Sequence, residues 1–496
     1  MAAHRSGDLA AAEAGYRAIL DRDPDQADAH HLLGMCLLQR RATREAFDHV
    51  NRAIALRPEV GAYHGTRGRI LRMAGKSEAA IPSLTRALRE APGDSKTENE
   101  LALALCDVKR YGEAEAVLRN AIARNPTDAD LRTALGRLHL LTADLPSAIA
   151  QFHAVLQNAP SHVNALNNLG VAFNLLSDPA SARLALERAL ALNGDHLDAH
   201  TNYGQLLLQQ GELAEGWRHH EWRLRRPDYR RNFAAPMWQG EPLDGRTILI
   251  WCEQGLGDAI HFIRYAPLVA ARGGRVVVEC LAPLHRLFAG VEGVAAVFDP
   301  GAARDYAVHV PVMSLPHLFK TTLETIPAAI PYVPSQPPMP IDAGGARLKV
   351  GLAWAGNPDY LRDRARSRRL ADFAPLAALR DVAFFGLQVG PAAGEPPPPK
   401  MDFTDLMADV ADFYDTTARL AAIDLLIAVD SACAHLAGAM GRPVWLLLDA
   451  VADWRWRSAG ERTPWYPTMR LFRRDGDWAA LFACVADALR QFEPDR

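Results

Sequence analysis

A spacing of 34 residues recurs through the first half of the chain and constrains its fold more than any other feature. Prolines follow it at Pro24, Pro58, Pro92, Pro126 and Pro160. A row of small residues follows it at Gly34, Gly68, Ala102, Gly136, Gly170 and Gly204. Small residues let paired helices approach closely, and a proline ends a helix because it lacks an N–H group. The spacing therefore predicts a solenoid of paired helices over residues 1–225.

This period, with its small residues and closing prolines, is the signature of tetratricopeptide repeats. Full repeats are expected at 27–60, 61–94, 95–128, 129–162 and 163–196. A sixth begins at Leu197 and lacks its closing proline, and terminal repeats are commonly atypical. We expect residues 226–245 to form an ordered connector that packs the solenoid on the rest of the chain. The arginines near this connector are expected to lie on a solvated face; they are Arg223, Arg225, Arg226, Arg230 and Arg231.

The length, net charge, apolar stretches and cysteines of the chain exclude several classes of protein. At 496 residues it is too long for a single core. A formal charge of −3 does not favour a nucleic-acid partner, because phosphate binding usually requires a strongly basic surface. No apolar stretch reaches the length of a membrane span, and the six cysteines are dispersed without a Cys-x-x-Cys pair. We therefore expect a cytoplasmic protein without a metal site or a disulfide framework.

The second half of the chain changes to short apolar segments that are typical of buried strands. They lie at 246–253, 275–280, 348–356, 382–390, 424–430 and 442–449. Helical segments such as 415–423 and 431–441 separate some of them, which predicts parallel β-α-β units with both sheet faces covered. A proline-rich linker at 331–345 divides these units. The expected fold class is therefore α plus α/β, a helical solenoid followed by two Rossmann-like lobes at 246–335 and 346–496.

Open α/β sheets bind ligands at the carboxyl ends of their strands, and three strand ends here carry polar residues. The first holds Gly255, Gly257 and Asp258. The glycines permit a close approach of a ligand to the backbone. Asp258 is either a chemical group of the site or a cap of the next helix.

The second strand end holds Asp430, Ser431 and His435 at the start of a helix. The N–H groups at a helix N-terminus suit a diphosphate, and His435 lies one turn beyond Ser431. The alternative is that Asp430 or Ser431 caps the helix and His435 lies in the core. The third strand end holds Asn357 and leads into a loop whose arginines either clamp phosphates or are solvated. They are Arg362, Arg364, Arg366, Arg368 and Arg369.

Two of these segments resemble the motifs of a known family. EQGLGDAIHFIRYAPL resembles the Leu-Gly-Asp motif of the ADP-heptose–lipopolysaccharide heptosyltransferases, and AVDSACAHLAGAMGRPVWLLL resembles their Asp-Thr-Gly-x-x-His-Leu donor motif, with Asp-Ser-Ala in place of Asp-Thr-Gly. The whole chain is similar to the bacterial tetratricopeptide glycosyltransferases whose catalytic part is heptosyltransferase-like (glycosyltransferase family 9). The resemblance implies a GT-B fold that holds a nucleotide-sugar donor in its C-terminal lobe and needs no metal or cofactor.

The same resemblance implies roles for individual residues. Asp258 would be the general base that deprotonates an acceptor hydroxyl, with inversion at the sugar carbon. The family's phosphate-binding lysine has no clear counterpart, and Arg366 or Arg368 is the nearest candidate. The residues that would hold the donor are Asp430, Ser431, His435, Asn357, Arg366, Arg368 and Gln388.

A second resemblance concerns the acceptor. The O-GlcNAc transferases also join repeats to a GT-B unit, and they line their solenoid with asparagines that grip a peptide backbone. The corresponding positions here are Leu32, Thr66, Glu100, Ala134, Asn168 and Asn202. Asn168 and Asn202 conform, so a peptide clamp would be short and close to the active cleft.

These observations predict an inverting glycosyltransferase that moves a sugar from a nucleotide-sugar donor to a protein or large glycan acceptor presented by the repeats. Two alternatives stay open. One is a repeat scaffold whose GT-B unit has lost catalysis and only binds a nucleotide or a partner. The other is a heptosyltransferase that acts on lipopolysaccharide. Asp258, Asp430 and His435 favour an enzyme over a scaffold, and the repeats favour a large acceptor.

Replacing both asparagines, Asn168→Ala together with Asn202→Ala, should raise the apparent KM for the acceptor and spare hydrolysis of the donor. The lost contacts would be uniform binding of a remote part of the acceptor, which changes KM and leaves kcat unchanged. Initial rates at varied acceptor concentration measure the effect. Deleting residues 1–128 should do less, once circular dichroism shows that the shortened chain is folded. An unchanged KM in the double variant would assign acceptor binding to the lobes alone.

Overall fold

The structure is a computed structural model that describes residues 2–226, 229, 231–358, 360 and 363–494. It divides into two compact units, Met1–Gly194 and Asp195–Arg496. The first unit is helical, and the second carries two parallel β-sheets. The expected class, α followed by α/β, is confirmed.

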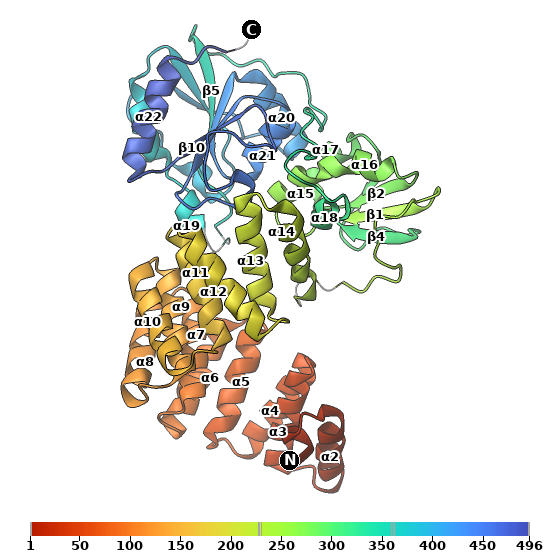
Figure 1. The fold of residues 1–496 in the computed structure, drawn as a ribbon, viewed down its shortest axis with the longest axis vertical. Helices are drawn as coiled ribbons and strands as arrows, with labels where there is room; N and C mark the ends of the chain where they lie inside the picture. Colours follow the sequence, from red (N-terminus) through yellow and green to blue (C-terminus); the bar gives the residue numbers. More distant parts are fainter. Residues whose placement is uncertain (1, 227–228, 230, 359, 361–362, 495–496) are drawn as a thin grey trace. The chain divides into compact units, whose positions relative to one another are not determined.

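The first unit is a series of helix pairs, drawn from red to yellow in Figure 1. The first helix of each predicted repeat begins at the predicted residue, which confirms the 34-residue register. The helices are α1 (Ala2–Arg5), α2 (Leu9–Arg22), α3 (Ala27–Gln39), α4 (Thr43–Leu56), α5 (Gly61–Met73), α6 (Ser77–Glu90), α7 (Ser95–Asp107), α8 (Tyr111–Arg124), α9 (Ala129–Leu141), α10 (Leu145–Asn158), α11 (Val163–Leu175) and α12 (Pro179–Leu192).

Close packing between paired helices explains the row of small residues. A Cβ atom added to Gly34 would lie 2.5 Å from Val50 Cγ2, and one added to Gly136 would lie 2.4 Å from Phe152 Cε1. Real Cβ atoms do not approach other atoms this closely, because interiors are packed to crystal-like density. The turn inside each pair also repeats every 34 residues, with a left-handed residue that is glycine at only two positions. These residues are Arg41, Gly75, Lys109, Ala143, Ser177 and Gly211.

The second unit begins with the helices of the sixth repeat and continues into a first sheet. The opening helices are α13 (Leu197–Gln210), α14 (Leu213–His220) and the 3₁₀ helix η1 (Glu221–Arg225). The sheet is parallel in the order β3-β2-β1-β4. Its strands are β1 (Thr247–Trp251), β2 (Arg275–Glu279), β3 (Val294–Phe298) and β4 (Val308–Pro311), and its helices are α15 (Leu256–Phe262), α16 (Ala266–Ala270), α17 (His285–Ala289) and α18 (Leu315–Leu318). We call these elements the first lobe.

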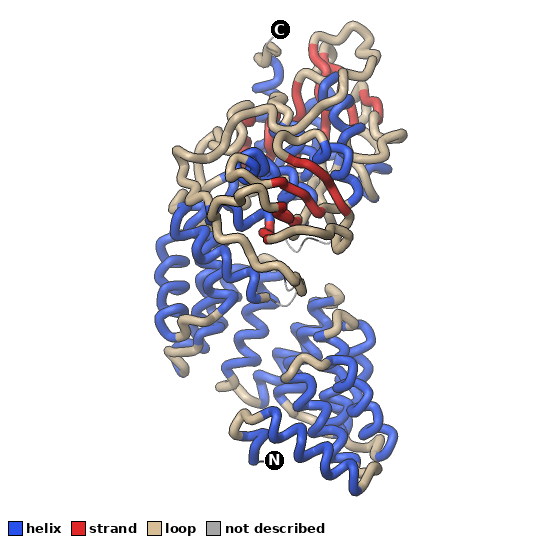
Figure 2. The backbone as a smooth tube through the Cα atoms, turned by 90° about the vertical axis from the view of Figure 1, so that its right-hand side faces the viewer, coloured by secondary structure: helices blue, strands red, loops and turns tan. Residues whose placement is uncertain are grey.

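The second sheet is also parallel, in the order β10-β9-β8-β5-β6-β7. Counted within the sheet this is 3-2-1-4-5-6, the order of a doubly wound sheet, and it reverses between β5 and β8. The strands are β5 (Leu348–Ala353), β6 (Val382–Gly386), β7 (Phe403–Asp405), β8 (Leu425–Val429), β9 (Val444–Leu448) and β10 (Met469–Arg473). The helices are α19 (Asp363–Arg366), η6 (Leu370–Ala378), α20 (Phe413–Ala422), α21 (Ala432–Ala439), η8 (Trp454–Trp456) and α22 (Trp478–Arg490). These elements form the second lobe, whose red strands lie among blue helices in Figure 2.

All predicted strands are present, and the linker 331–345 contains neither helix nor strand in the described chain. The sequence did not reveal β3, β4, β7 and β10. The strand β7 has three residues, and in β10 the arginines Arg470 and Arg473 interrupt the buried residues Met469, Leu471 and Phe472. Such segments lack the continuous apolar run that marks a strand covered on both faces.

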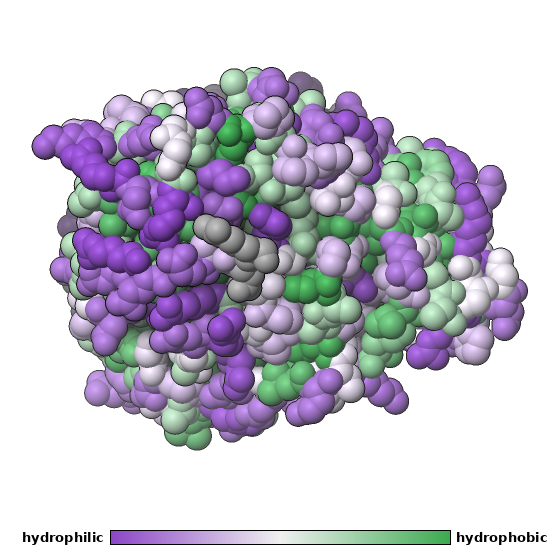
Figure 3. Space-filling view, turned by 90° about the horizontal axis from the view of Figure 1, so that it is seen from above, coloured by the Kyte–Doolittle hydropathy of each residue, from purple (hydrophilic) through white to green (hydrophobic). Residues whose placement is uncertain are grey.

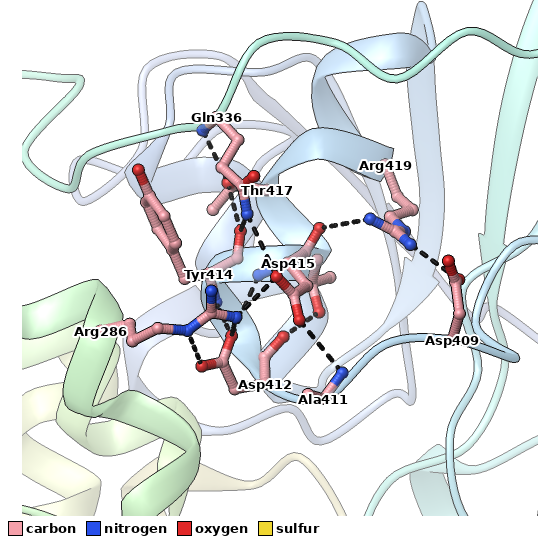
Figure 4. Close-up of polar contacts among 10 residues, drawn as sticks. Arg286, Gln336, Asp409, Ala411, Asp412, Tyr414, Asp415, Thr417 and Arg419 are labelled. Carbon is pink, nitrogen blue, oxygen red and sulfur yellow. Dashed lines mark hydrogen bonds and ion pairs between the residues drawn. The ribbon is translucent and has the colours of Figure 1, made fainter.

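Polar contacts join the lobes at the start of α20 (Figure 4). Arg286 of α17 donates from Nε to Asp412 Oδ2 at 2.6 Å and from Nη2 to Asp415 Oδ1 at 2.6 Å. Asp412 also caps α20 by accepting from two backbone N–H groups of that helix. The backbone N–H of Gln336, in the linker, donates to Thr417 Oγ1 at 2.9 Å. Both lobes and the linker therefore meet at one helix end.

On the face drawn in Figure 3, hydrophobic residues occur in small groups between hydrophilic ones. Within the described ranges, no helix combines the length and the apolar character needed to cross a membrane.

Candidate active site

A pocket of about 400 Å³ opens at the carboxyl ends of β8 and β9. Asp430 follows β8 and Asp449 follows β9, and both line the pocket together with Asp453 and Arg366. Doubly wound sheets bind their ligands at this edge, next to the point where the strand order reverses. The pocket lies at this edge of the second sheet. It is therefore the candidate ligand site of the second lobe.

Two of the three carboxylates of this pocket pair with an arginine. Asp453 Oδ1 accepts from Arg455 Nη1 at 2.9 Å, and Asp449 Oδ1 accepts from Arg474 Nε at 2.7 Å. Burial raises the pKa of Asp430 to about 6, and the nearby charge of Asp453 acts in the same direction. The guanidinium groups of Arg366 and Arg455 oppose this shift. The acidic lining is thus largely compensated before any ligand enters.

The structure separates the two arginines that were candidates for holding phosphate. Arg366 lines the pocket, and its guanidinium lies so close to Gly356 that a Cβ added there would be 2.5 Å from Arg366 Nη2. Arg368 instead lies over the Trp478 ring, 4.2 Å from its centroid, and donates to the Arg364 carbonyl. Of the two arginines, Arg366 is therefore the one that lies at the pocket, where its Nε also donates to Asp363 Oδ1 at 3.1 Å. Arg230 and Arg362 lie outside the described residues.

The two other predicted donor residues differ in their surroundings. Asn357 is exposed at the end of β5, next to the loop that carries Arg366. Gln388 is buried, and its Oε1 accepts from the backbone N–H groups of Trp354 and Ala355 at 3.0 and 2.9 Å. Its amide nitrogen donates to two backbone carbonyls. Gln388 thus holds the strand end in place, and its role toward a donor stays a prediction.

The helices α15 and α21 bring the remaining predicted residues together from different lobes. A Cβ added to Gly257 would lie 2.9 Å from His435 Cδ2 and 3.4 Å from Ala432 Cα. Asp258, the next residue, accepts from the Gly255 backbone N–H at 3.0 Å through Oδ2. Its other oxygen, Oδ1, pairs with Arg455 Nη2 of the second lobe. Asp258 therefore caps its own helix and also pairs with Arg455, which in turn pairs with Asp453 of the pocket.

At the start of α21 the predicted side chains occupy the positions expected of a helix cap and a core residue. Ser431 is the N-cap, and its Oγ accepts from the Ala434 N–H at 3.5 Å. His435 is buried, with Nδ1 2.9 Å from the Tyr466 hydroxyl and Nε2 3.6 Å from Asp430 Oδ1. Burial holds the pKa of His435 well below its ordinary value, so its imidazole is neutral at pH 7.

Arg223 was expected on a solvated face, and this prediction is wrong: the residue is 2% exposed. Its Nη2 donates to Glu253 Oε1 at 2.7 Å and to Ser314 Oγ at 2.9 Å. Its Nη1 donates to Glu221 Oε1 at 2.6 Å. Glu253 follows β1 and Ser314 follows β4, so Arg223 fills the crevice where the first sheet reverses. Glu253 was the feature of the sequence that could have indicated a buried arginine, because a carboxylate at a buried strand end requires a cation.

A second pocket, of about 630 Å³, lies beside this crevice in the first lobe. Trp251, at the end of β1, and His309 and Pro311 of β4 line it with Phe233 of the connector. Phe233 stacks on His309 with ring centroids 3.8 Å apart. No strand-end motif marks these residues in the sequence.

The two asparagines predicted to bind the acceptor belong to different units. Asn168 lies half-buried on α11 of the first unit and accepts from Asn167 Nδ2 at 3.3 Å. Asn202 lies half-buried on α13 of the second unit. Among the described residues there is no group of three or more His, Cys, Asp or Glu side chains that could hold a metal ion.

Comparison with known proteins identifies the repeats. Two sequence profiles of tetratricopeptide repeats match the chain, one over residues 107–169 and the other over 1–60, 44–95 and 175–216. The chain thus carries tetratricopeptide repeats within residues 1–216 and continues into an α/β region with parallel sheets.

Similar proteins extend over different parts of the chain. Protein FlbA of Caulobacter vibrioides is 28% identical over 520 aligned residues, covering 96% of this chain and 86% of FlbA. BBSome complex member BBS4 of Bos taurus is 25% identical over 212 residues, 42% of this chain and 40% of BBS4. Among solved structures, the APC/C hetero-tetramer Cut9–Hcn1 is 21% identical, with a TM-score of 0.41 over 45% of this chain and 44% of that one. YrrB, a tetratricopeptide-repeat protein with an unusual peptide-binding site, is 20% identical, with a TM-score of 0.30 over 37% of this chain and 95% of that one.

Removing the Arg223 side chain should destabilise the second unit strongly. The variant Arg223→Ala leaves Glu253 buried without its cation, and such a loss costs about 3–5 kcal/mol. Arg225→Ala is the matched control, because Arg225 is exposed and should change the free energy of unfolding by at most about 0.5 kcal/mol. Urea unfolding followed by tryptophan fluorescence reports on the second unit alone, since all ten tryptophans lie there. Equal unfolding curves for both variants would contradict a buried ion network.

Proposed function

We propose that the chain is a metal-independent inverting glycosyltransferase of the GT-B type. A nucleotide-sugar donor would bind the pocket of the second lobe, and a protein or large glycan acceptor presented by the repeats would approach from the first lobe. One observation carries the proposal: Asp258 of the first lobe pairs with Arg455, which also holds Asp453 of the pocket. A candidate base and a candidate donor pocket are thereby held next to each other.

The second lobe offers an anion several favourable groups. The helix α21 begins beside Asp430 and directs its first N–H groups toward the carboxyl edge of the sheet. Arg366 adds a positive charge in the pocket. Together a helix N-terminus and an arginine suit a diphosphate. The carboxylates of Asp449 and Asp453 suit the hydroxyl groups of a ribose or a sugar, which donate hydrogen bonds to carboxylate oxygens.

Asp258 retains the capacity to act as a base despite its two partners. A carboxylate has about four acceptor positions, and each oxygen of Asp258 uses one of them. An acceptor hydroxyl can therefore still donate to it. In the proposed step Asp258 takes the hydroxyl proton, the acceptor oxygen bonds to the anomeric carbon, and the bond from that carbon to the diphosphate breaks. The nucleoside diphosphate leaves with the electron pair, toward Arg366 and the start of α21.

The acceptor side of the proposal depends on the first lobe and the repeats. The aromatic pocket around Trp251 and His309 lies at the same strand ends as the loop that carries Asp258. Repeat solenoids bind extended partners along their surface, which favours a large acceptor. Asn168 and Asn202 would contribute side-chain hydrogen bonds to such a partner.

The alternative is a repeat scaffold whose α/β region binds a nucleotide without catalysis. The observation in its favour is that Asp258, Ser431 and His435 all have structural partners. A heptosyltransferase acting on lipopolysaccharide is a second alternative, which rests on the motif resemblance.

The variant Asp258→Asn should lower turnover about 10²–10⁴-fold, the usual contribution of a general base, and leave nucleotide binding intact. Asp372→Asn is a matched control, because Asp372 caps η6 through the same contact, from the Arg369 N–H to Oδ2 at 3.0 Å. It should retain full activity. The assay is release of nucleoside diphosphate from a panel of nucleotide sugars.

Equal turnover of wild type and Asp258→Asn would reduce Asp258 to a helix cap. If the wild type released no nucleoside diphosphate from any sugar donor, with or without an acceptor, the scaffold alternative would replace the proposal.

A further inference from the structure

A hydrogen-bonded chain of three buried side chains crosses between the lobes beside the candidate site. The Tyr466 hydroxyl lies 2.9 Å from His261 Nδ1 of α15 and 2.9 Å from His435 Nδ1 of α21. All three side chains are almost completely buried. Burial, together with the charges of Arg264 and Arg455, holds the pKa of both histidines well below the ordinary value. Each imidazole is therefore neutral and carries a single N–H.

The number of protons shared by these three side chains restricts the tautomers of the two histidines. A tyrosine hydroxyl has one proton to donate and lone pairs to accept with. The Tyr332 hydroxyl is 3.4 Å from Tyr466, beyond the usual range for an O–H···O bond, and is itself 3.1 Å from the Ile260 carbonyl. The Tyr466 proton therefore goes to one imidazole Nδ1, and the other imidazole donates its Nδ1–H to the hydroxyl oxygen. His261 and His435 must be opposite tautomers.

The surroundings of Nε2 in each ring decide which tautomer His261 and His435 adopt. His435 Nε2 lies 3.6 Å from Asp430 Oδ1, where an N–H is favoured by the carboxylate. His261 Nε2 is buried and has no hydrogen-bond partner among the described residues. An unpaired buried N–H is rarer than an unpaired acceptor, so the proton of His261 belongs on Nδ1. His435 is then the Nε2–H tautomer and accepts the Tyr466 proton at Nδ1.

We propose that Tyr466 is a positioning residue that fixes His435 as the Nε2–H tautomer, so that the imidazole presents a neutral N–H donor beside Asp430. This inference rests on the proposed function, because the group that would receive the N–H is the diphosphate of the donor. An imidazole that stays neutral at pH 7 offers the diphosphate the same N–H hydrogen bond throughout the reaction. The same hydroxyl ties His261, one turn beyond Asp258, to the second lobe.

The tautomers can be read directly from ¹⁵N spectra of the full chain labelled at histidine, with His435→Gln and His261→Gln used for assignment. We expect Nε2–H at His435 and Nδ1–H at His261 at pH 7. Tyr332→Phe is the matched control and should leave both signals unchanged. Tyr466→Phe removes the proton donated to His435 Nδ1, so His435 should populate both tautomers. The same tautomer at both histidines in the wild type, or Nδ1–H at His435, would overturn the proposal.

Binding provides a second, independent readout. For whichever of the uridine, guanosine, adenosine and cytidine diphosphates binds the wild type, Tyr466→Phe should raise Kd about tenfold, the loss of one hydrogen bond to a charged group. Tyr332→Phe should stay within about twofold. Equal losses in both variants would show a packing role and contradict the positioning role. If no nucleoside diphosphate binds the wild type, the proposed function fails, and the spectra alone decide the tautomers.

Discussion

The close contact between α15 and α21 is the constraint on which the rest of the site depends. Gly257 has no side chain, and the ring of His435 occupies the space that a Cβ would need. Because the helices touch at this point, Asp258 of one lobe reaches Arg455 of the other, and His261 shares a hydroxyl with His435. Any larger residue at position 257 would separate these pairs. One backbone position therefore links the packing of the lobes to the chemistry proposed between them.

The two sheets differ at the point where their strand order reverses. In the first lobe the crevice between β1 and β4 is filled by Arg223, which neutralises the buried carboxylate of Glu253. In the second lobe the corresponding edge opens into the pocket, where Arg366 lies against Gly356, and Asp449 and Asp453 are paired with arginines. A ligand can therefore enter the edge of the second lobe, where charged side chains are already in place. In the first lobe Arg223 itself occupies the equivalent crevice. This difference assigns the donor to the second lobe in the proposed function.

The sequence predicted those features that follow from a repeated or continuous pattern. The 34-residue register located the helix starts at Ala27 and Gly61, because the small residues and prolines report directly on helix packing. The strand ends at Asp258 and Asp430 were likewise found, since they follow apolar runs. The burial of Arg223 and the chain through Tyr466 were not predicted, because their partners are distant in sequence and only the tertiary fold brings them together. The orientation of Arg368 away from the pocket also depends on a tertiary contact, its packing over Trp478 of α22.

Calorimetric titration of the full chain with nucleoside diphosphates in the presence of EDTA tests the proposed donor site most directly. We expect at least one of them to bind without a divalent metal. Arg366→Ala and His435→Ala should weaken this binding, whereas Arg368→Ala, at a side chain that lies over Trp478, should change it little. Binding that disappears in EDTA would contradict a metal-independent site. Failure of every nucleoside diphosphate to bind, with metal or without it, would contradict the assignment of a nucleotide-sugar donor to the second lobe.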